Sequence, residues 1–365
     1  MEALTQTLCA VTIAQVVMWC IGGVLIYLAI AKNMEPALLL PMGFGAILVN
    51  LPDSGAAAVI GHLFELGISQ YEVFPLLLFI GIGAMIDFQP LLCSPRLMLF
   101  GAAAQFGIFF TLGLASLLGF ALKDAASIAI IGAADGPTSI FVAQVLKSNH
   151  TAAIMVAAYS YMALVPMVQP PIIRLCTTRA ERKIRMQYKS RSVSRLTKIL
   201  FPIGVTVIVG LVAPDAVALI GFLMFGNLIR ECGVLNSLSD TAQNVLANLI
   251  TILLGLTIAS RMSAEEFLRV ETLLVMGLGL VAFVADTFGG IMLAKFMNLF
   301  LKEKINPMIG AAGISAFPMS ARVVHKLGLE EDNQNFLLMH AVGVNVSGQI
   351  ASVIAGGLIL ALVGG

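Results

Sequence analysis

The chain has 365 residues, of which 59% are hydrophobic and only 11% are charged. This composition is typical of a polytopic helical membrane protein and excludes a soluble domain of useful size. The formal net charge of +1 hides a cluster, because eight of the 21 basic residues fall between Arg179 and Lys198. Such a stretch can bind nucleic acid or lipid. Between two hydrophobic halves we interpret it as a cytoplasmic loop that obeys the positive-inside rule, and we expect no nucleic-acid partner.

Apolar segments follow one another through both halves of the chain, and several are shorter than the roughly 20 residues of a perpendicular span. They lie at residues 12–31, 36–50, 75–92, 97–121, 126–146, 152–173, 199–213, 216–229, 244–260, 270–299, 306–325 and 335–363. The region 51–74 is too polar to span and indicates a loop with an interfacial helix. We therefore predict a first membrane repeat over residues 1–178, a basic cytoplasmic loop over 179–198 and a second membrane repeat over 199–365.

An internal repeat relates the two halves. Residues 131–134 (IGAA) recur as 309–312, and each copy is followed by a stretch rich in Gly, Ser and Pro. Earlier in each half Gly45 parallels Gly226, and further matches align 79–83 with 253–257 and Tyr161 with Asn345. If the segments 126–146 and 306–325 are re-entrant hairpins, each half crosses the membrane five times, and an odd count inverts the second half. The predicted fold is an all-α polytopic membrane protein with two inverted structural repeats, each with a re-entrant or broken-helix segment.

Asp135 lies between glycines and a proline inside the apolar segment 126–146. A bare carboxylate in a membrane is costly, so a function is the default hypothesis. The glycines and Pro137 break helix geometry and expose backbone carbonyls, which together with one acid can replace the hydration shell of a small cation. The segment therefore predicts an ion site of a secondary-transporter kind, near the bilayer midplane.

Other polar residues give weaker signals. The five cysteines have no CxxC or Cys/His spacing, which indicates neither a disulfide framework nor a transition-metal site. Asp286 and Lys295 are about two and a half helical turns apart, so they do not form a natural pair on one face.

Three long motifs resemble a known family. They are residues 132–137 (GAADGP), 306–322 (NPMIGAAGISAFPMSAR) and 340–349 (HAVGVNVSGQ). The chain is similar to the membrane-embedded beta subunit of sodium-pumping, biotin-dependent decarboxylases, which act on oxaloacetate, methylmalonyl-CoA or glutaconyl-CoA. The resemblance implies that the chain, an inner (plasma) membrane protein, decarboxylates carboxybiotin and couples this step to sodium export and proton consumption.

The resemblance also implies cofactors, partners and site residues. Sodium is the only metal expected, and biotin is carried on a partner subunit. The expected partners are a carboxyltransferase alpha subunit, a biotin carrier protein or domain, a small membrane-anchored subunit and further copies of this chain. The implied catalytic residues are Asp135, Tyr161 and Arg322. The implied sodium-binding residues are Asp135, Asn306, Gly310, Ser315, Asn345 and Ser352. A hard cation requires several oxygen ligands, and a planar guanidinium suits a carboxylate.

Each assignment has an alternative. Asp135 could cap a broken helix, Tyr161 could be a buried tyrosine with a satisfied hydroxyl, and Asn306 before Pro307 could start a helix. Asn345 and Ser352 could join neighbouring helices, and Arg322 could reach the membrane interface. Either Asp135 or Tyr161 could hold the transferred proton. At the level of function, the residues alone do not distinguish a decarboxylase subunit from a stand-alone sodium-coupled antiporter or symporter.

Overall fold

A computed structural model describes residues 11–70, 72–187 and 192–364 of the chain. The first half begins with two neighbouring helices, α2 (Ile13–Ala31) and α3 (Pro36–Val49). A capping box starts α2, since the Thr12 hydroxyl accepts from the Gln15 N–H and the Gln15 side chain accepts from the Thr12 N–H. The rest of this half contains α4 (Gly55–Phe64), α5 (Val73–Met85), α6 (Gln89–Cys93), α7 (Met98–Ala103), α8 (Phe106–Leu117), α9 (Leu122–Ala129), α10 (Gly136–Val145) and α11 (Thr151–Cys176).

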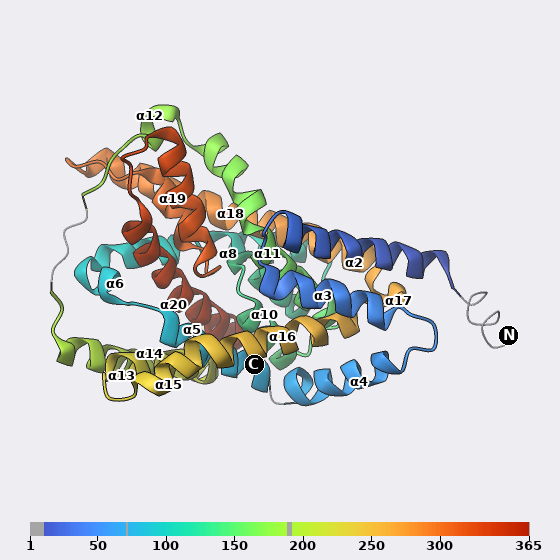
Figure 1. The fold of residues 1–365 in the computed structure, drawn as a ribbon. Coiled ribbons are helices and arrows are strands. Elements are labelled where there is room, and N and C mark those ends of the chain that lie inside the picture. The colour runs from blue at the N-terminus through green and yellow to red at the C-terminus, as the bar shows by residue number, and fades with distance from the viewer. Residues whose placement is uncertain (1–10, 71, 188–191, 365) are drawn as a thin grey trace, which may run out of the picture.

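The basic stretch begins with a short helix, α12 (Arg179–Arg182), and the second half follows it. Its helices are α13 (Arg195–Val212), α14 (Val217–Glu231), α15 (Asn236–Asp240), α16 (Ala247–Ile258), α17 (Ala264–Phe267), α18 (Val270–Phe300), α19 (Met319–Glu331) and α20 (Leu338–Val363). In Figure 1, α10 and α11 lie in the middle of the molecule, where α10 contacts α20 and α11 contacts α18.

Seven helices among the described residues are long and apolar enough to cross a membrane. A further pair, Gly55–Ser69 with Val73–Met85, meets the same test as one segment bent by 64°. The region 51–74 thus contains a helix, as predicted. Three of the predicted crossings are helices of only 13 to 15 residues, namely α3, α5 and α14. The protein is an all-α, multi-pass membrane protein, whereas the count of five crossings per half stays a prediction.

Both predicted interruptions are present and buried. Residues 122–145 form α9, a 3-10 turn (Ile130–Ala133) and α10, which are separated by Ala134 in a left-handed conformation with φ of 52°. Residues 307–331 form a second 3-10 segment (Pro307–Gly313) followed by α19. Every residue of 124–140 and of 306–316 is buried. Irregular backbone is tolerated at membrane depth only where protein covers it, so the surrounding helices make these breaks possible.

Glycines allow close contacts between helices of the two halves, while the repeat itself stays a prediction. A Cβ at Gly45 in α3 would lie 2.6 Å from the Ala259 side chain that follows α16, and a Cβ at Gly226 in α14 would lie 2.0 Å from the Ile80 carbonyl of α5. The sequence repeat pairs Gly45 with Gly226 and α5 with α16. Each half therefore places its equivalent glycine against the equivalent helix of the other half. The inverted orientation of the two halves stays a prediction.

The contact between α5 and α14 predicts a stability difference between two glycine variants. We expect Gly226→Ala to destabilise the protein by about 1–3 kcal/mol, because the added methyl group would overlap the Ile80 carbonyl. Gly277→Ala in α18 is the control, since a Cβ there has nothing within 4 Å, and we expect it to stabilise by about 0.5–1 kcal/mol. Unfolding midpoints of the detergent-solubilised variants measure both effects. Equal midpoints for the two variants would contradict the proposed packing.

Candidate functional site

Asp135 occupies the break between the first 3-10 turn and α10. Its Oδ1 accepts the Thr138 N–H at 3.3 Å, so it caps α10 as the alternative interpretation expected. Its Oδ2 accepts two hydroxyl groups, from Thr138 at 2.7 Å and from Ser352 of α20 at 2.8 Å. The carboxyl group is buried and forms no ion pair among the described residues. The capping role and a place in a polar site are therefore combined in one side chain.

The two interrupted segments meet beside this carboxyl group. Ser315, which follows the second 3-10 segment, donates its N–H to the Ala133 carbonyl at 2.9 Å and its hydroxyl to the same oxygen at 3.0 Å. Both residues are buried. Because Ala133 is the last residue of its 3-10 turn and Ser315 lies outside any helix, the carbonyl and the N–H are free to pair across the two halves.

Two amide side chains of α20 complete the layer over the second segment. Asn345 donates its Nδ2 to the carbonyls of Ala312 (3.1 Å) and Ile314 (2.7 Å), and the Gln349 Nε2 donates to the Ser315 carbonyl. The oxygens of both amides, Asn345 Oδ1 and Gln349 Oε1, are buried without a partner among the described residues. A buried unpaired amide oxygen costs about 1–3 kcal/mol, which a bound cation would offset. Gln349 was not among the predicted residues.

Tyr159 is a second group that the sequence did not single out. Its ring lies against Gly136, where a Cβ would be 2.5 Å from the ring Cζ, and its buried hydroxyl has no partner among the described residues. The predicted Tyr161 is directed elsewhere, since its hydroxyl donates to the Met276 carbonyl of α18. Residues two apart on a helix point about 200° apart, so only one of the two tyrosines can face α10. The sequence alone does not give the rotation of α11.

Asn306 is bound to the basic loop. Its Nδ2 donates to the carbonyls of Arg182 and Ile184, both at 2.9 Å, and its Oδ1 accepts the Met308 N–H at 3.0 Å. It therefore caps the second 3-10 segment, as the alternative expected, and also fixes the loop over it. Charge pairs add to this attachment, since Arg182 contacts Glu331 at 2.7 Å and holds the pKa of that carboxyl below its usual range.

Gly310 and Arg322 lie further along the same segment. A Cβ at Gly310 would be 2.1 Å from the Gly290 carbonyl of α18, so the glycine permits a backbone contact between the two elements. Arg322 is exposed in the first turn of α19 and forms no ion pair among the described residues. Burial raises the pKa of Glu35, between α2 and α3, and the positive charge of Arg322 opposes part of that rise. Arg322 thus lies near the turn between α2 and α3.

The structure gathers some of the predicted residues and separates others. Asp135, Ser315, Asn345 and Ser352 line the junction of the two broken segments, together with Tyr159 and Gln349. The other predicted residues lie away from the junction. Gly310 contacts α18, and Asn306 donates to the basic loop. Tyr161 donates to the Met276 carbonyl, and Arg322 lies near the turn between α2 and α3. Lys295 pairs with Glu181 at 3.1 Å, which confirms that it is not a partner of Asp286.

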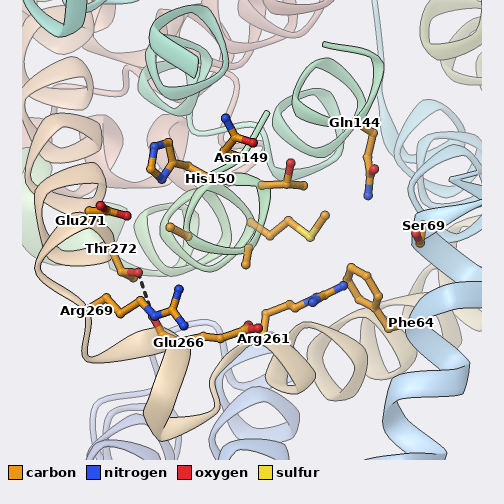
Figure 2. A pocket seen from close by; sticks show the side chains of 14 residues that line it. Phe64, Ser69, Gln144, Asn149, His150, Arg261, Glu266, Arg269, Glu271 and Thr272 are labelled. Atoms are coloured by element: carbon orange, nitrogen blue, oxygen red, sulfur yellow. Dashed lines mark hydrogen bonds between the residues drawn. The ribbon is translucent and has the colours of Figure 1, made fainter. Parts of the chain in front are cut away.

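A separate polar cavity of about 290 Å³ lies at the start of α11. Figure 2 shows Arg261 and Arg269 on one side of it and His150, Asn149 and Gln144 on the other. The Arg261 guanidinium stacks on the Phe64 ring, 4.4 Å from its centroid. Gln144 is near the end of α10 opposite to Asp135, and ten helical residues extend about 15 Å. This cavity is therefore distinct from the junction, and no predicted site residue lines it.

Comparisons with known proteins agree with this architecture. The model of the Na+-transporting oxaloacetate decarboxylase beta subunit matches residues 14–363. The chain belongs to this family. It is 50% identical to a methylmalonyl-CoA decarboxylase subunit beta of Propionigenium modestum, over 96% of this chain and 95% of the relative. It is 49% identical to a glutaconyl-CoA decarboxylase subunit beta of Acidaminococcus fermentans, over 98% of this chain and 95% of the relative.

Family membership decides between the two functions that the residues left open. The chain is the membrane subunit of a sodium-transporting decarboxylase, and not a stand-alone antiporter or symporter. A probable oxaloacetate decarboxylase beta chain of Pasteurella multocida is 46% identical over 95% of this chain and 94% of the relative. As a beta subunit the chain functions in a complex, so sodium and partner subunits are implied.

The attachment of the basic loop predicts a change in proteolysis. In Asn306→Asp the cap on Met308 is kept, but a carboxylate oxygen replaces the amide that donates to Arg182 and Ile184. We expect trypsin to cleave at Lys183 and Arg185 several-fold faster, because the new carboxylate oxygen would repel the carbonyl oxygens of Arg182 and Ile184 and release the loop. Asn244→Asp is the control, since Asn244 is exposed and donates to the Asp240 carbonyl at 3.1 Å. Equal cleavage rates in the two variants would show that Asn306 does not hold the loop.

Proposed function

We propose that this chain binds sodium at the junction of the two broken segments and couples its export to the decarboxylation of carboxybiotin. The observation that carries the sodium site is the buried Asp135 carboxyl group, together with two amide oxygens at the same junction that have no partner in the described ranges. Carboxylate, hydroxyl, amide and backbone oxygens are the ligands that a hard cation prefers. Asp135, Ser315, Asn345 and Ser352 would supply these ligands, and we add Gln349. Asn306 and Gly310 would act by holding the second segment in place.

Arg322 suits the other half of the reaction. It is exposed at one end of the helix that follows the second broken segment and forms no ion pair within the described part of the chain, so a carboxylate carried by another protein can reach it. Its guanidinium would hold that carboxylate in two parallel hydrogen bonds. In the reaction the carbon–nitrogen bond breaks, its electron pair stays on the biotin nitrogen, which takes up one proton, and carbon dioxide leaves. Tyr159, rather than Tyr161, is the tyrosine placed beside Asp135.

The proposed complex contains subunits that the chain itself cannot replace. A carboxyltransferase alpha subunit and a biotin carrier protein or domain would load and deliver carboxybiotin. A small membrane-anchored subunit and further copies of this chain would complete the assembly. The single carboxyl group at the junction supports this division, because the described residues there provide no second carboxyl group for a carboxyl transfer from a free acid.

We propose an acyl-CoA, and not oxaloacetate, as the source of the carboxyl group. The alignments with acyl-CoA relatives extend over 353 to 376 residues, close to the 365 of this chain. The alignments with the oxaloacetate relatives extend over 409 to 415 residues and therefore need many gaps. Vesicles that contain the complex, supplied in turn with methylmalonyl-CoA, glutaconyl-CoA or oxaloacetate, distinguish these substrates.

Asp135→Asn tests the sodium site. We expect it to lower sodium uptake that is driven by decarboxylation and blocked by avidin at least ~100-fold, because losing one partner of a buried charge pair costs about 3–5 kcal/mol. The shape of the side chain and its cap on Thr138 are kept. Asp124→Asn is the control, since Asp124 is also buried but its oxygens accept from Ser148 and Asn149. Normal uptake in a folded Asp135→Asn complex would refute the sodium site.

Arg322→Lys tests the carboxylate site. Lysine keeps the charge but loses the planar fork, so we expect carboxybiotin turnover to fall roughly tenfold or more while sodium binding stays near the wild-type value. The control is Arg174→Lys, because Arg174 pairs with Glu330 at 2.9 Å on the surface and such pairs contribute little. Turnover and sodium binding are measured on the same purified complex. A parallel loss of both would indicate a purely structural arginine.

A further inference from the structure

Asp286 is a second buried acid that the proposed function does not use. It lies in the middle of α18, is fully buried and forms no ion pair among the described residues. Its Oδ1 accepts the N–H groups of Gly107 and Ile108, the latter at 3.3 Å. These are the second and third N–H groups of α8, in the first turn, where N–H groups have no carbonyl one full helical turn earlier. The Ile108 N–H also donates to the Gln105 carbonyl at 3.2 Å. Oδ1 therefore attaches the start of α8 to α18.

The other oxygen of Asp286 faces the first broken segment. Oδ2 is buried without a partner among the described residues, and a Cβ at Gly132 would lie 2.6 Å from it. One helical turn further along α18, Gly290 contacts Gly310 of the second broken segment. Asp286 thus lies on a helix that packs against both interruptions, as α20 also does.

The space around Oδ2 suits a proton rather than a metal ion. Sodium needs several oxygen ligands, whereas Oδ1 of Asp286 already accepts two N–H groups and Oδ2 has no polar partner among the described residues. Gly132 is so close that a methyl group could not fit beside the oxygen. A proton needs no such room. It also removes the cost of burying a negative charge on a carboxylate of which only Oδ1 accepts hydrogen bonds from the described residues.

The surroundings of Asp286 contain few other groups that titrate. The 3-10 segments, α7 and α8 carry none, and from α11 Tyr161 donates to the Met276 carbonyl. The remaining titratable groups on these elements are Tyr159, Arg174 and Cys176 of α11, Lys123 and Asp124 of α9, Glu265 and Glu266 of α17, and Glu271 and Lys295 of α18 itself. Asp124 and Lys295 have partners of their own. The nearest acid along the first broken segment is Asp135, three residues after Gly132. The Cα atoms of Gly132 and Asp135 are therefore at most about 11 Å apart.

We propose that Asp286 is a proton-binding site coupled to the sodium site at Asp135. With sodium absent, the negative charge of Asp135 favours the neutral, protonated form of Asp286, because like charges repel in a medium of low dielectric constant. When sodium binds, it neutralises Asp135, and Asp286 releases its proton and keeps the negative charge. The binding of one sodium ion is thereby coupled to the release of one proton. This inference rests on the proposed function, since it assumes that sodium binds at Asp135.

Proton release on sodium binding tests the proposal. The detergent-purified complex is titrated with sodium chloride in weak buffer across a pH series, and sodium binding and released protons are recorded together. We expect the wild-type protein to release protons in one pH window. Asp286→Asn should bind sodium but lose this release, because asparagine keeps the acceptor for Gly107 and cannot ionise. Asp124→Asn, the matched buried aspartate, should release protons as the wild type does.

The remaining variants separate the possible failures. Unchanged proton release in Asp286→Asn, or none at any pH in the wild type, overturns the proton site. Sodium binding that survives in Asp135→Asn overturns the proposed function instead. If Asp286→Asn does not fold, infrared difference spectra of the wild type and of Asp286→Glu take its place. We expect sodium to remove the C=O band of a protonated carboxyl group, at a frequency that differs between the two proteins. A band that is absent, or identical in both, overturns the proposal.

Discussion

Two hydrogen bonds from Ser315 to the Ala133 carbonyl connect the halves of this protein where the two 3-10 segments end. The rest of the site depends on this junction. It requires two breaks in apolar sequence, and each break leaves backbone groups that must be paired inside the protein. The breaks pair with each other and with the amides of α20, and Asp135 receives the Ser352 hydroxyl from that helix. A polar layer forms in this way without an isolated charge on the lipid side.

Polar groups also pair with one another at the end of the molecule that carries the basic loop. The charges gather outside the apolar helices, where Arg182 pairs with Glu331 and Arg185 pairs with Asp332. Asn306 connects that charged surface to the start of the second broken segment. A movement of the loop would therefore reach the junction through one short 3-10 segment that packs on α18. The charged surface and the buried polar site are therefore connected by a single short segment, residues 306–315.

Much of the fold and part of the site could be predicted from the sequence, for identifiable reasons. Apolar length predicts helices, and glycines with proline predict the breaks at 132–137 and 306–318 without reference to the rest of the chain. Asp135 stands out because a carboxylate in such sequence is costly. The choice between Tyr159 and Tyr161 depends on how α11 is rotated against α10, and no local pattern contains that angle. For a similar reason no local pattern predicts the contact at the start of α8, since the Gly107 N–H donates to Asp286, 179 residues away.

The crossed packing of α3 on α16 and of α5 on α14 has a consequence for the origin of the molecule. Each half covers its glycine-lined helix with a helix of the other half, so one half alone would leave that face bare. A single-repeat ancestor could have buried it only against a second copy of itself. If the predicted repeat arose by gene duplication and fusion, the fusion joined two partners that already fitted, and each half could then acquire its own polar residues. Asp135 in one half and Arg322 in the other are the kind of asymmetry that only a fused pair can maintain.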